Sequence, residues 1–434
     1  MRSLLLLLII MIVTPTALLL PHLGALVWTW LSIMNPHRLS WGFTYDMPFV
    51  MIIASVTLTA WFMSREPKLP PSRALMWLAL WFTVHMTITT FTALHPEHSW
   101  PLWDRRIKTM VLFFVVATLI NSKVRMQAML WIIAISLGYF GANGVAETLS
   151  SGGKNYLEGP PNTMISDNNH IALTLTMLLP VLNYLRTTSS IKLVRVAVTV
   201  VIAFCLIAVI TSYSRGALIG LAVGIIAFFR RARGRFLLLT MVSAVGLITI
   251  SLMPGKWHER VMTMQSVDSV TEDKSFSGRM DAWTVSWKVA SARPLVGAGF
   301  SGIEIAQTYQ KYIPDWDRPG RAAHSIYFQV LGDHGFIGLG LFVAMLLCTW
   351  LHLRRTMART RETPDEWSHQ LAKMLEVTLV IFAVGGAALS MAYHDFILII
   401  MTISMNLDLV TARLAGEEKT QFVAQNHEYR PQTQ

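Results

Sequence analysis

Residues 322–338 read AAHSIYFQVLGDHGFIG and open an apolar helix directly after the longest polar segment of the chain. Ser325 and the glycines Gly335 and Gly338 bracket about three helical turns, roughly 15 Å at ~1.5 Å per residue. His324 is therefore predicted to lie at a membrane–water boundary, at the start of the helix and facing the polar segment. An ionisable group at that depth marks a candidate functional site by default.

The composition is that of a helical membrane protein. Of the 434 residues, 53% are hydrophobic and 14% are charged, against roughly a quarter charged in soluble proteins; the mean hydropathy is +0.48. The net charge of +11 gives no reason to expect nucleic acid, because the basic residues lie in short loops that orient the protein and contact membrane lipids. Cys205 and Cys348 lie in apolar runs, as buried small hydrophobes do, rather than as a disulfide or metal pair.

Repeated apolar runs predict an all-α polytopic protein of about twelve transmembrane helices with one large helical periplasmic loop. The first span, residues 4–34, is too long for one straight crossing and contains Pro15 and Pro21, which predicts a broken or kinked helix. The remaining spans are expected near residues 48–63, 74–93, 107–120, 126–147, 169–185, 192–211, 216–229, 236–253, 325–353, 371–394 and 396–410.

Basic loops fall on alternate turns of this count, at residues 65–73, 123–125, 186–195, 230–235 and 354–373. The positive-inside rule places them, and both termini, in the cytoplasm. The pair Arg105 and Arg106 is the exception, because the count leaves it on the outer side.

Four parts of the chain follow from this count. They are residues 1–253 with transmembrane helices one to nine, a periplasmic loop at 254–323, residues 324–412 with the last three helices, and a cytoplasmic tail at 413–434 that is expected to be disordered. The loop is far longer than a connector requires, and its periodic segments at 281–290 and 303–312 predict short amphipathic helices. Long structured loops usually carry function.

Three residues on the predicted outer side are candidates for catalysis. Arg215 lies in a tight turn between two spans, where its guanidinium could clamp a phosphate; the alternative is an arginine that extends to lipid headgroups. Arg279 begins a loop helix, and an ordinary salt bridge is equally compatible with its position. His324 is suited to general-base catalysis near neutral pH, or to capping its helix at the interface.

Other polar residues give weaker indications. His334 lies inside the same helix as a predicted buried, hydrogen-bonded group, and His170, at the mouth of another span, is a substrate-binding candidate. Asp315-Trp316-Asp317 has the Asp-x-Asp spacing that holds a divalent cation in some glycosyltransferases, but this pair is common in polar loops and no metal is expected. No phosphate-cradling loop or nucleotide fingerprint occurs, so no cofactor is expected and any bond energy must arrive in the substrate.

These motifs resemble a known family. His324-Ser325, followed after nine residues by Gly335-Phe-Ile-Gly338, is similar to the histidine motif of bacterial O-antigen ligases. The Ser-Arg-Gly turn at Arg215, the Gly-Arg-x-x-x-Trp segment at Arg279 and the PLVGAG run at 294–299 resemble the same superfamily, which includes O-antigen polymerases. The motif order covers 167–353, and residues 34–43 (MNPHRLSWGF) resemble a subgroup labelled O-glycosylation ligases, which leaves the acceptor open.

The resemblance implies an enzyme of the bacterial inner membrane that transfers a glycan from undecaprenyl pyrophosphate to a hydroxyl of lipid A-core at the periplasmic face, completing lipopolysaccharide. No metal or nucleotide would take part. Arg215 and Arg279 would stabilise the departing diphosphate, and His324 would deprotonate the acceptor hydroxyl from the opposite face, giving inversion. Further loop cations would hold anionic core phosphates, namely Lys256, Arg260, Arg293, Arg318 and Arg321.

Three alternatives stay open at this point. An O-antigen polymerase and a protein O-oligosaccharyltransferase would use the same lipid-linked donor. A lipid-linked glycan transporter or flippase would need charged residues buried in mid-span along a path, and the centres of the predicted spans carry almost none.

Overall fold

The computed structural model describes residues 2–40, 42–71, 73–151, 157–229, 274–313, 315–362 and 367–428. Within these residues the secondary structure is helical and contains no strand, which confirms the predicted all-α class. The predicted span at 236–253, the basic loop at 230–235 and the candidates Lys256 and Arg260 lie outside the described residues.

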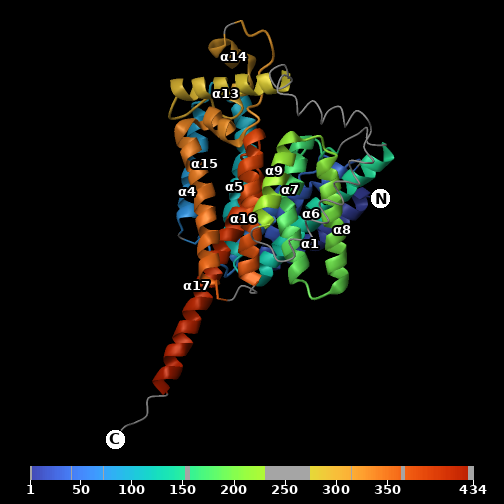
Figure 1. The fold of residues 1–434 in the computed structure, drawn as a ribbon, viewed down its shortest axis with the longest axis vertical. Helices are drawn as coiled ribbons and strands as arrows, with labels where there is room; N and C mark the ends of the chain where they lie inside the picture. The colour runs from blue at the N-terminus through green and yellow to red at the C-terminus, as the bar shows by residue number, and fades with distance from the viewer. Residues whose placement is uncertain are drawn as a thin grey trace.

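The helices form a bundle with a cap at one end (Figure 1). The first part of the chain forms α1 (Arg2–Leu19), α2 (Pro21–Met34), η1 (Pro36–Leu39), α3 (Phe49–Met63), α4 (Ala74–Phe91), α5 (Pro96–Leu119), α6 (Lys123–Ser150), α7 (Asn168–Thr188), α8 (Lys192–Ile210) and α9 (Arg215–Phe229). The later part forms α13 (Lys274–Ala292), η2 (Gly302–Glu304), α14 (Ala306–Tyr312), α15 (Ile326–Arg359), α16 (Trp367–Gly385), η3 (Gly386–Ala388) and α17 (Asp395–Glu428).

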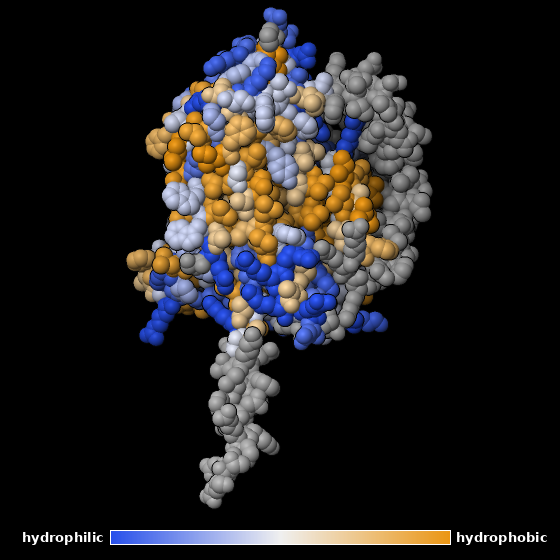
Figure 2. Space-filling model, turned by 60° about the vertical axis from the view of Figure 1, so that its left-hand side comes forward, coloured by the Kyte–Doolittle hydropathy of each residue, from blue (hydrophilic) through white to orange (hydrophobic). Residues whose placement is uncertain are grey.

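Much of the bundle has the length and hydropathy of membrane spans. Among the described residues, seven helices are long and apolar enough to cross a membrane, namely α1, α4, α6, α8, α15, α16 and α17, while α3 and α9 are shorter apolar helices. Figure 2 shows an apolar band across the face in view, with hydrophilic residues above and below it. The described residues therefore support a multi-pass membrane protein, with fewer qualifying helices than the count of about twelve predicted above.

The first predicted span is broken, as its prolines indicate. Leu20 leaves the helical conformation between α1 and α2, and Pro21 begins the second helix, where its missing N–H costs no hydrogen bond. The C-terminal tail departs from expectation, because α17 continues as a helix to Glu428 instead of ending near residue 413. The residues beyond 413 include Ala, Glu, Lys and Gln, which are strong helix formers and carry the last turns onward.

The interior of the bundle contains more acidic groups than the sequence analysis anticipated. Asp333 in α15, Glu376 in α16 and Asp408 in α17 are all buried. Glu376 accepts a hydrogen bond from Trp350 Nε1 at 2.9 Å, and Asp408 contacts His352 Nδ1 at 2.8 Å. Asp408 lies near the end of its predicted span, Asp333 and Glu376 lie further inside theirs, and each acid is buried with a polar partner.

The helix α13 and the shorter helix α14 lie at one end of the bundle, at the top of Figure 1. We call this end the capped end. These helices confirm the amphipathic segments predicted within the long loop. They pack on the start of α15 through a small apolar core that includes Val285, Tyr309 and Ala323.

The helix α15 changes direction at Gly335, where φ is 67° and ψ is −166°. The turns before this break are bound to the capping segment, since the amides of Ala298 and Gly299 donate to the carbonyls of Gly332 and Asp333 at 2.8 and 2.9 Å. The amide of Phe336, just after the break, donates to the Pro294 carbonyl at 2.9 Å. The first three turns of α15 are thus fixed to the cap.

Replacing Gly335 by alanine is expected to lower the free energy of unfolding by about 1–3 kcal/mol, because this backbone conformation is essentially restricted to glycine. A Cβ there would also lie 2.5 Å from the Pro294 carbonyl oxygen. The matched control is Gly340→Ala, whose Cβ would meet nothing within 4 Å and should leave stability unchanged or slightly raised. Thermal unfolding in one detergent compares the two, and equal melting temperatures would contradict the role given to Gly335.

Candidate functional site at the capped end

His324 lies in a left-handed turn directly before α15, with φ at 43°. The turn is held from above by Trp283 of α13, whose Nε1 donates to the carbonyl of Ala323 at 2.7 Å. The Trp283 ring also stacks on Phe328, with the ring centroids 5.0 Å apart and the planes inclined by 7°. The tryptophan of the Gly-Arg-x-x-x-Trp segment therefore positions the histidine turn, which explains why both motifs occur in one chain.

Two guanidinium groups lie beside this turn. Arg279 precedes Trp283 by one turn of α13 and is close enough to act on the charge of His324. Arg321 lies against the backbone of α13, since a Cβ on Gly278 would come within 1.8 Å of its Nη1 atom. The glycine of the motif thus leaves room for a second cation next to Arg279. The structure thus brings Arg279, Arg321 and His324 together.

The surroundings of His324 favour its neutral form. The residue keeps contact with solvent, but neighbouring atoms enclose part of its ring. This partial burial lowers the pKa of His324 from 6.5, and the charges of Arg279 and His170 lower the pKa further, while Asp167 acts in the opposite direction. An imidazole with a lowered pKa is unprotonated at neutral pH and can accept a proton.

The start of α7 forms another side of the site. Asp167 caps this helix, with its Oδ1 accepting the amide of Asn169 at 2.8 Å. The next residue, Asn168, donates from Nδ2 to the carbonyl of Ser212 at 2.7 Å, and so joins α7 to the turn between α8 and α9. His170, predicted as a weaker substrate-binding candidate, is therefore placed near His324, and its charge acts on that residue.

Arg215 is the first residue of α9 and follows this turn. A Cβ on its neighbour Gly216 would lie 3.4 Å from Ala388, at the end of η3. A Cβ on Gly386, at the start of η3, would lie 2.9 Å from Ile326, two residues after His324. Arg215 thus belongs to the same end of the bundle, and the described contacts connect it to the histidine turn through η3.

Other predicted loop cations lie elsewhere. Arg293 follows the far end of α13, about 20 Å along the helix from Arg279, and its guanidinium donates to the carbonyl of Thr92. Arg318 pairs with Asp317 at 3.5 Å and lies over the Trp316 ring at 5.6 Å. Within the described residues, the structure gathers no group of three or more His, Cys, Asp or Glu side chains that could hold a metal ion.

His334 occupies the buried, hydrogen-bonded position predicted for it, away from the exposed histidine turn. It is fully buried, and its Nδ1 lies 2.7 Å from the hydroxyl of Thr89. Its carbonyl lies 2.9 Å from His85 Nε2. His334 therefore joins α15 to α4.

Sequence analysis missed the role of Asp333. This carboxyl group is 2% exposed; one oxygen accepts the amide of Ser301 at 3.0 Å and the other accepts the hydroxyl of Tyr393 at 3.0 Å. Asp333 thus fixes the capping segment and the turn before α17 to the start of α15. A single acid within an apolar run was the only sign of it in the sequence.

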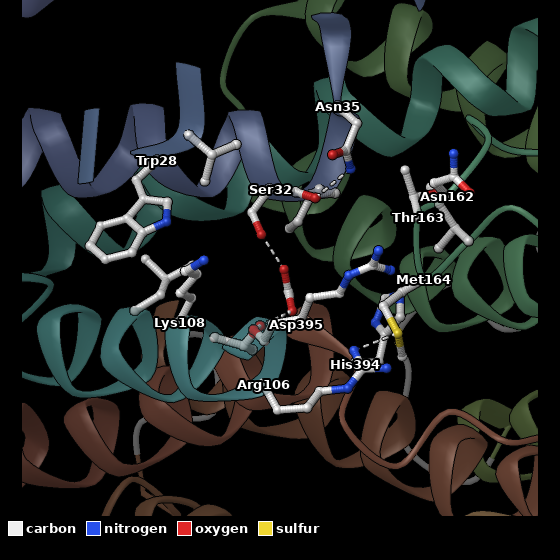
Figure 3. Close-up of a pocket in the computed structure, with 16 residues that line it drawn as sticks. Trp28, Ser32, Asn35, Arg106, Lys108, Asn162, Thr163, Met164, His394 and Asp395 are labelled. Atoms are coloured by element: carbon white, nitrogen blue, oxygen red, sulfur yellow. Dashed lines mark hydrogen bonds between the residues drawn. The ribbon is translucent and has the colours of Figure 1, made fainter. Parts of the chain in front are cut away.

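Sequence analysis also missed a cavity of about 360 Å³ below the cap. It is lined by the end of α2, the start of α3, the middle of α5, residues 162–165 and the start of α17 (Figure 3). Its charged lining residues are Arg105, Arg106, Lys108 and Asp395. The position of Arg105 and Arg106 against the positive-inside pattern was the only sign of this cavity in the sequence.

Two family models match the chain. Residues 200–343 match the model described as O-antigen ligase, a range that includes Arg215, Arg279 and His324. Residues 1–190 match a model described as a family of unknown function, and this range includes most of the cavity lining. No curated protein gives a significant match.

Proposed function

We propose, from the premise that residues 200–343 make this chain a member of the O-antigen ligase family, that it transfers a glycan from undecaprenyl pyrophosphate to a hydroxyl of lipid A-core. The observation that supports this reaction is the gathering of His324, Arg279 and Arg321 at one mouth of the bundle. A diphosphate leaving group and a hydroxyl nucleophile need these groups, namely guanidinium ions for the first and a neutral imidazole for the second.

The proposed reaction has one chemical step. The acceptor oxygen attacks the anomeric carbon, the bond from that carbon to the diphosphate oxygen breaks, and the hydroxyl proton passes to the His324 imidazole. Negative charge that gathers on the diphosphate is stabilised by Arg279 and Arg215. Because the base and the arginines act from opposite faces of the sugar, the anomeric configuration inverts.

The proposed orientation follows from the basic loops. We place the protein in the bacterial inner membrane with both termini in the cytoplasm and the capped end in the periplasm. There His170 and Arg321 can contact the donor or the anionic phosphates of the core. Bond energy arrives in the diphosphate ester, so the proposed transfer needs neither a nucleotide nor a metal ion.

An in vitro transfer assay tests this function. Purified protein receives the lipid-linked glycan and lipid A-core in the presence of EDTA, and the products are separated on a gel. Glycan on the core supports a ligase, and its loss in EDTA would contradict metal independence. Longer lipid-linked chains without modified core would indicate a polymerase, whereas glycan on an added pilin-like protein would indicate a protein O-oligosaccharyltransferase. Passage of the lipid-linked glycan across a vesicle membrane without transfer would indicate a transporter.

The pH dependence of transfer tests the role of His324. Burial and the Arg279 charge lower the pKa of His324 from 6.5, so the neutral base persists below pH 6.5 and the rate falls only as the pH drops through the lowered pKa. In Arg279→Gln the positive charge is absent, and the residual rate should begin to fall at a higher pH. A pH–rate profile at saturating donor measures this shift.

Lys288→Gln is the matched control for this profile. Lys288 is a cation on the same helix α13, and its Nζ donates to the Tyr312 carbonyl at 2.8 Å. Its loss should leave the acid limb of the profile in place. An unshifted limb in Arg279→Gln would contradict the assignment of that limb to His324.

A further inference from the structure

We propose that the cavity between α2, α5 and the start of α17 binds the phosphate of a membrane lipid, at a site separate from the histidine turn. The cavity lining includes none of His324, Arg279 and Arg215. Lipid binding there would not depend on glycan transfer, so the inference stands or falls independently of the proposed function.

The lining carries more positive than negative charge. Three cations, Arg105, Arg106 and Lys108, face one carboxylate, Asp395. Lys108 is already paired with Asp104 at 2.5 Å. The two arginines therefore provide the excess charge that an anion would neutralise.

The carboxylate of Asp395 is held by hydroxyl groups on both sides. Its Oδ2 accepts the Ser32 hydroxyl from α2, and its Oδ1 accepts the Thr109 hydroxyl from α5 at 3.0 Å. Figure 3 shows Asp395 directed toward Ser32, while the Arg106 side chain extends toward Met164 and His394. Asp395 thus joins three helices at the wall of the cavity instead of pairing with a guanidinium.

Arg106 has only weak partners. Its Nη1 donates to the thioether of Met164 at 2.7 Å, its guanidinium lies 5.4 Å from the centroid of the Tyr393 ring, and its Nε is buried without a hydrogen-bond acceptor. Among the described residues, no carboxylate lies within ion-pair distance of Arg106 or of Arg105. Arg106 is half-buried, and Asp395, the strongest charge that attracts it, makes no direct ion pair with it. Desolvating a guanidinium without a direct ion pair is costly, and a bound anion would reduce that cost.

The shape of the cavity indicates a phosphate that is attached to a lipid. Guanidinium groups bind phosphate oxygens in pairs, and 360 Å³ is far more space than one phosphate needs. The lining also includes the apolar side chains of Trp28, Ile33 and Leu112. An amphiphile would use both parts of the lining, with its phosphate at the arginines and its first carbons on the apolar side chains.

The depth of the cavity also fits a lipid headgroup. Ser99, in the first turn of α5, donates its hydroxyl to the carbonyl of Phe300 in the capping segment at 3.1 Å. Arg106 lies seven residues further along α5, roughly 10 Å below that contact. A headgroup bound at Arg106 would therefore lie just beneath the cap, at the edge of the apolar band.

Equilibrium binding to the full-length protein in detergent tests the proposal. All proteins carry Arg279→Gln, which weakens anion binding at the histidine turn, and the probes are polyprenyl phosphate, phosphatidylglycerol and inorganic pyrophosphate. A further Arg106→Gln change should weaken binding of at least one lipid by about tenfold or more, because a charge-assisted pair is lost. Comparison of the two lipids then identifies which one supplies the phosphate.

Two further variants keep the result decisive. Asp395→Asn removes the negative charge and should tighten lipid binding several-fold, an effect that a damaged fold would not produce. Arg355→Gln, an exposed arginine in the last turns of α15, should leave binding unchanged. The proposal would be overturned if Arg106→Gln left lipid binding unchanged, or if the protein bound pyrophosphate but neither lipid. If Arg106→Gln fails to fold, the Asp395→Asn variant decides, and the absence of tighter lipid binding in it would overturn the proposal.

Discussion

Replacing His324 by alanine should lower the rate of glycan transfer by roughly 10²–10⁴-fold, the range typical for loss of a general base. The surroundings of His324 lower the pKa of its ring, and Trp283 holds the turn in which His324 lies. Transfer is measured by the appearance of modified lipid A-core under single-turnover conditions. Full activity in a correctly inserted His324→Ala protein would refute the mechanism.

Matched variants separate the chemistry of His324 from its backbone. The left-handed φ of 43° is tolerated by asparagine better than by most residues, so His324→Asn keeps the turn and removes the base. It should lose as much activity as His324→Ala. His98, an exposed histidine in the first turn of α5 that contacts Glu97 at 3.1 Å, is the control, and His98→Ala should retain activity.

The second large effect is expected for Arg279 and Arg215. Arg279→Gln should lower the rate by roughly 10²–10³-fold, because one preplaced electrostatic donor for the leaving diphosphate is removed. Arg279→Lys keeps the charge but loses the paired geometry of the guanidinium, and should recover only part of the rate. A rate for Arg279→Gln close to that of the wild type would contradict the assignment.

The pairing of Arg279 with Arg215 is tested by combining their variants. Arg215→Gln should lower the rate by a similar factor, although η3 lies between Arg215 and the histidine turn. If both guanidinium groups act on one diphosphate, the double variant should lose less than the product of the single losses. If the loss of rate in the double variant equals the product of the two single losses, the two arginines act independently and not on one diphosphate.

Some local features of the capped end could be predicted from sequence because they depend on residues that lie close together in the chain. The buried position of His334 and the helices within the long loop each depend on residues a few turns apart. The break at Gly335 was not predicted, because the presence of a glycine does not by itself reveal a positive φ, and the nearness of Arg279 to His324 was implied only by the family resemblance. The tail past residue 413 was misjudged because a polar segment can continue a helix that has already started, and helix-forming residues need no apolar face to do so.

The cavity and the Asp333 network could not be predicted in the same way. Asp333 finds its partners in Ser301 and Tyr393, and the cavity joins residues near 32, 106, 164 and 395, which only the packing of the bundle brings together. Arg293 is a residue that the sequence grouped with the site but the structure does not. Both Arg293 and Arg279 are cations of the long loop, but the length of α13 separates them.

The break in α15 also bears on how the protein fits its bilayer. Because backbone hydrogen bonds tie α15 to the cap on both sides of Gly335, a change in the tilt of the bundle in hydrocarbon layers of different thickness should carry the cap and His324 with it. The position of the proposed base relative to the proposed diphosphate-binding arginines is then set by the cap, and membranes of altered acyl-chain length should leave the rate of transfer unchanged.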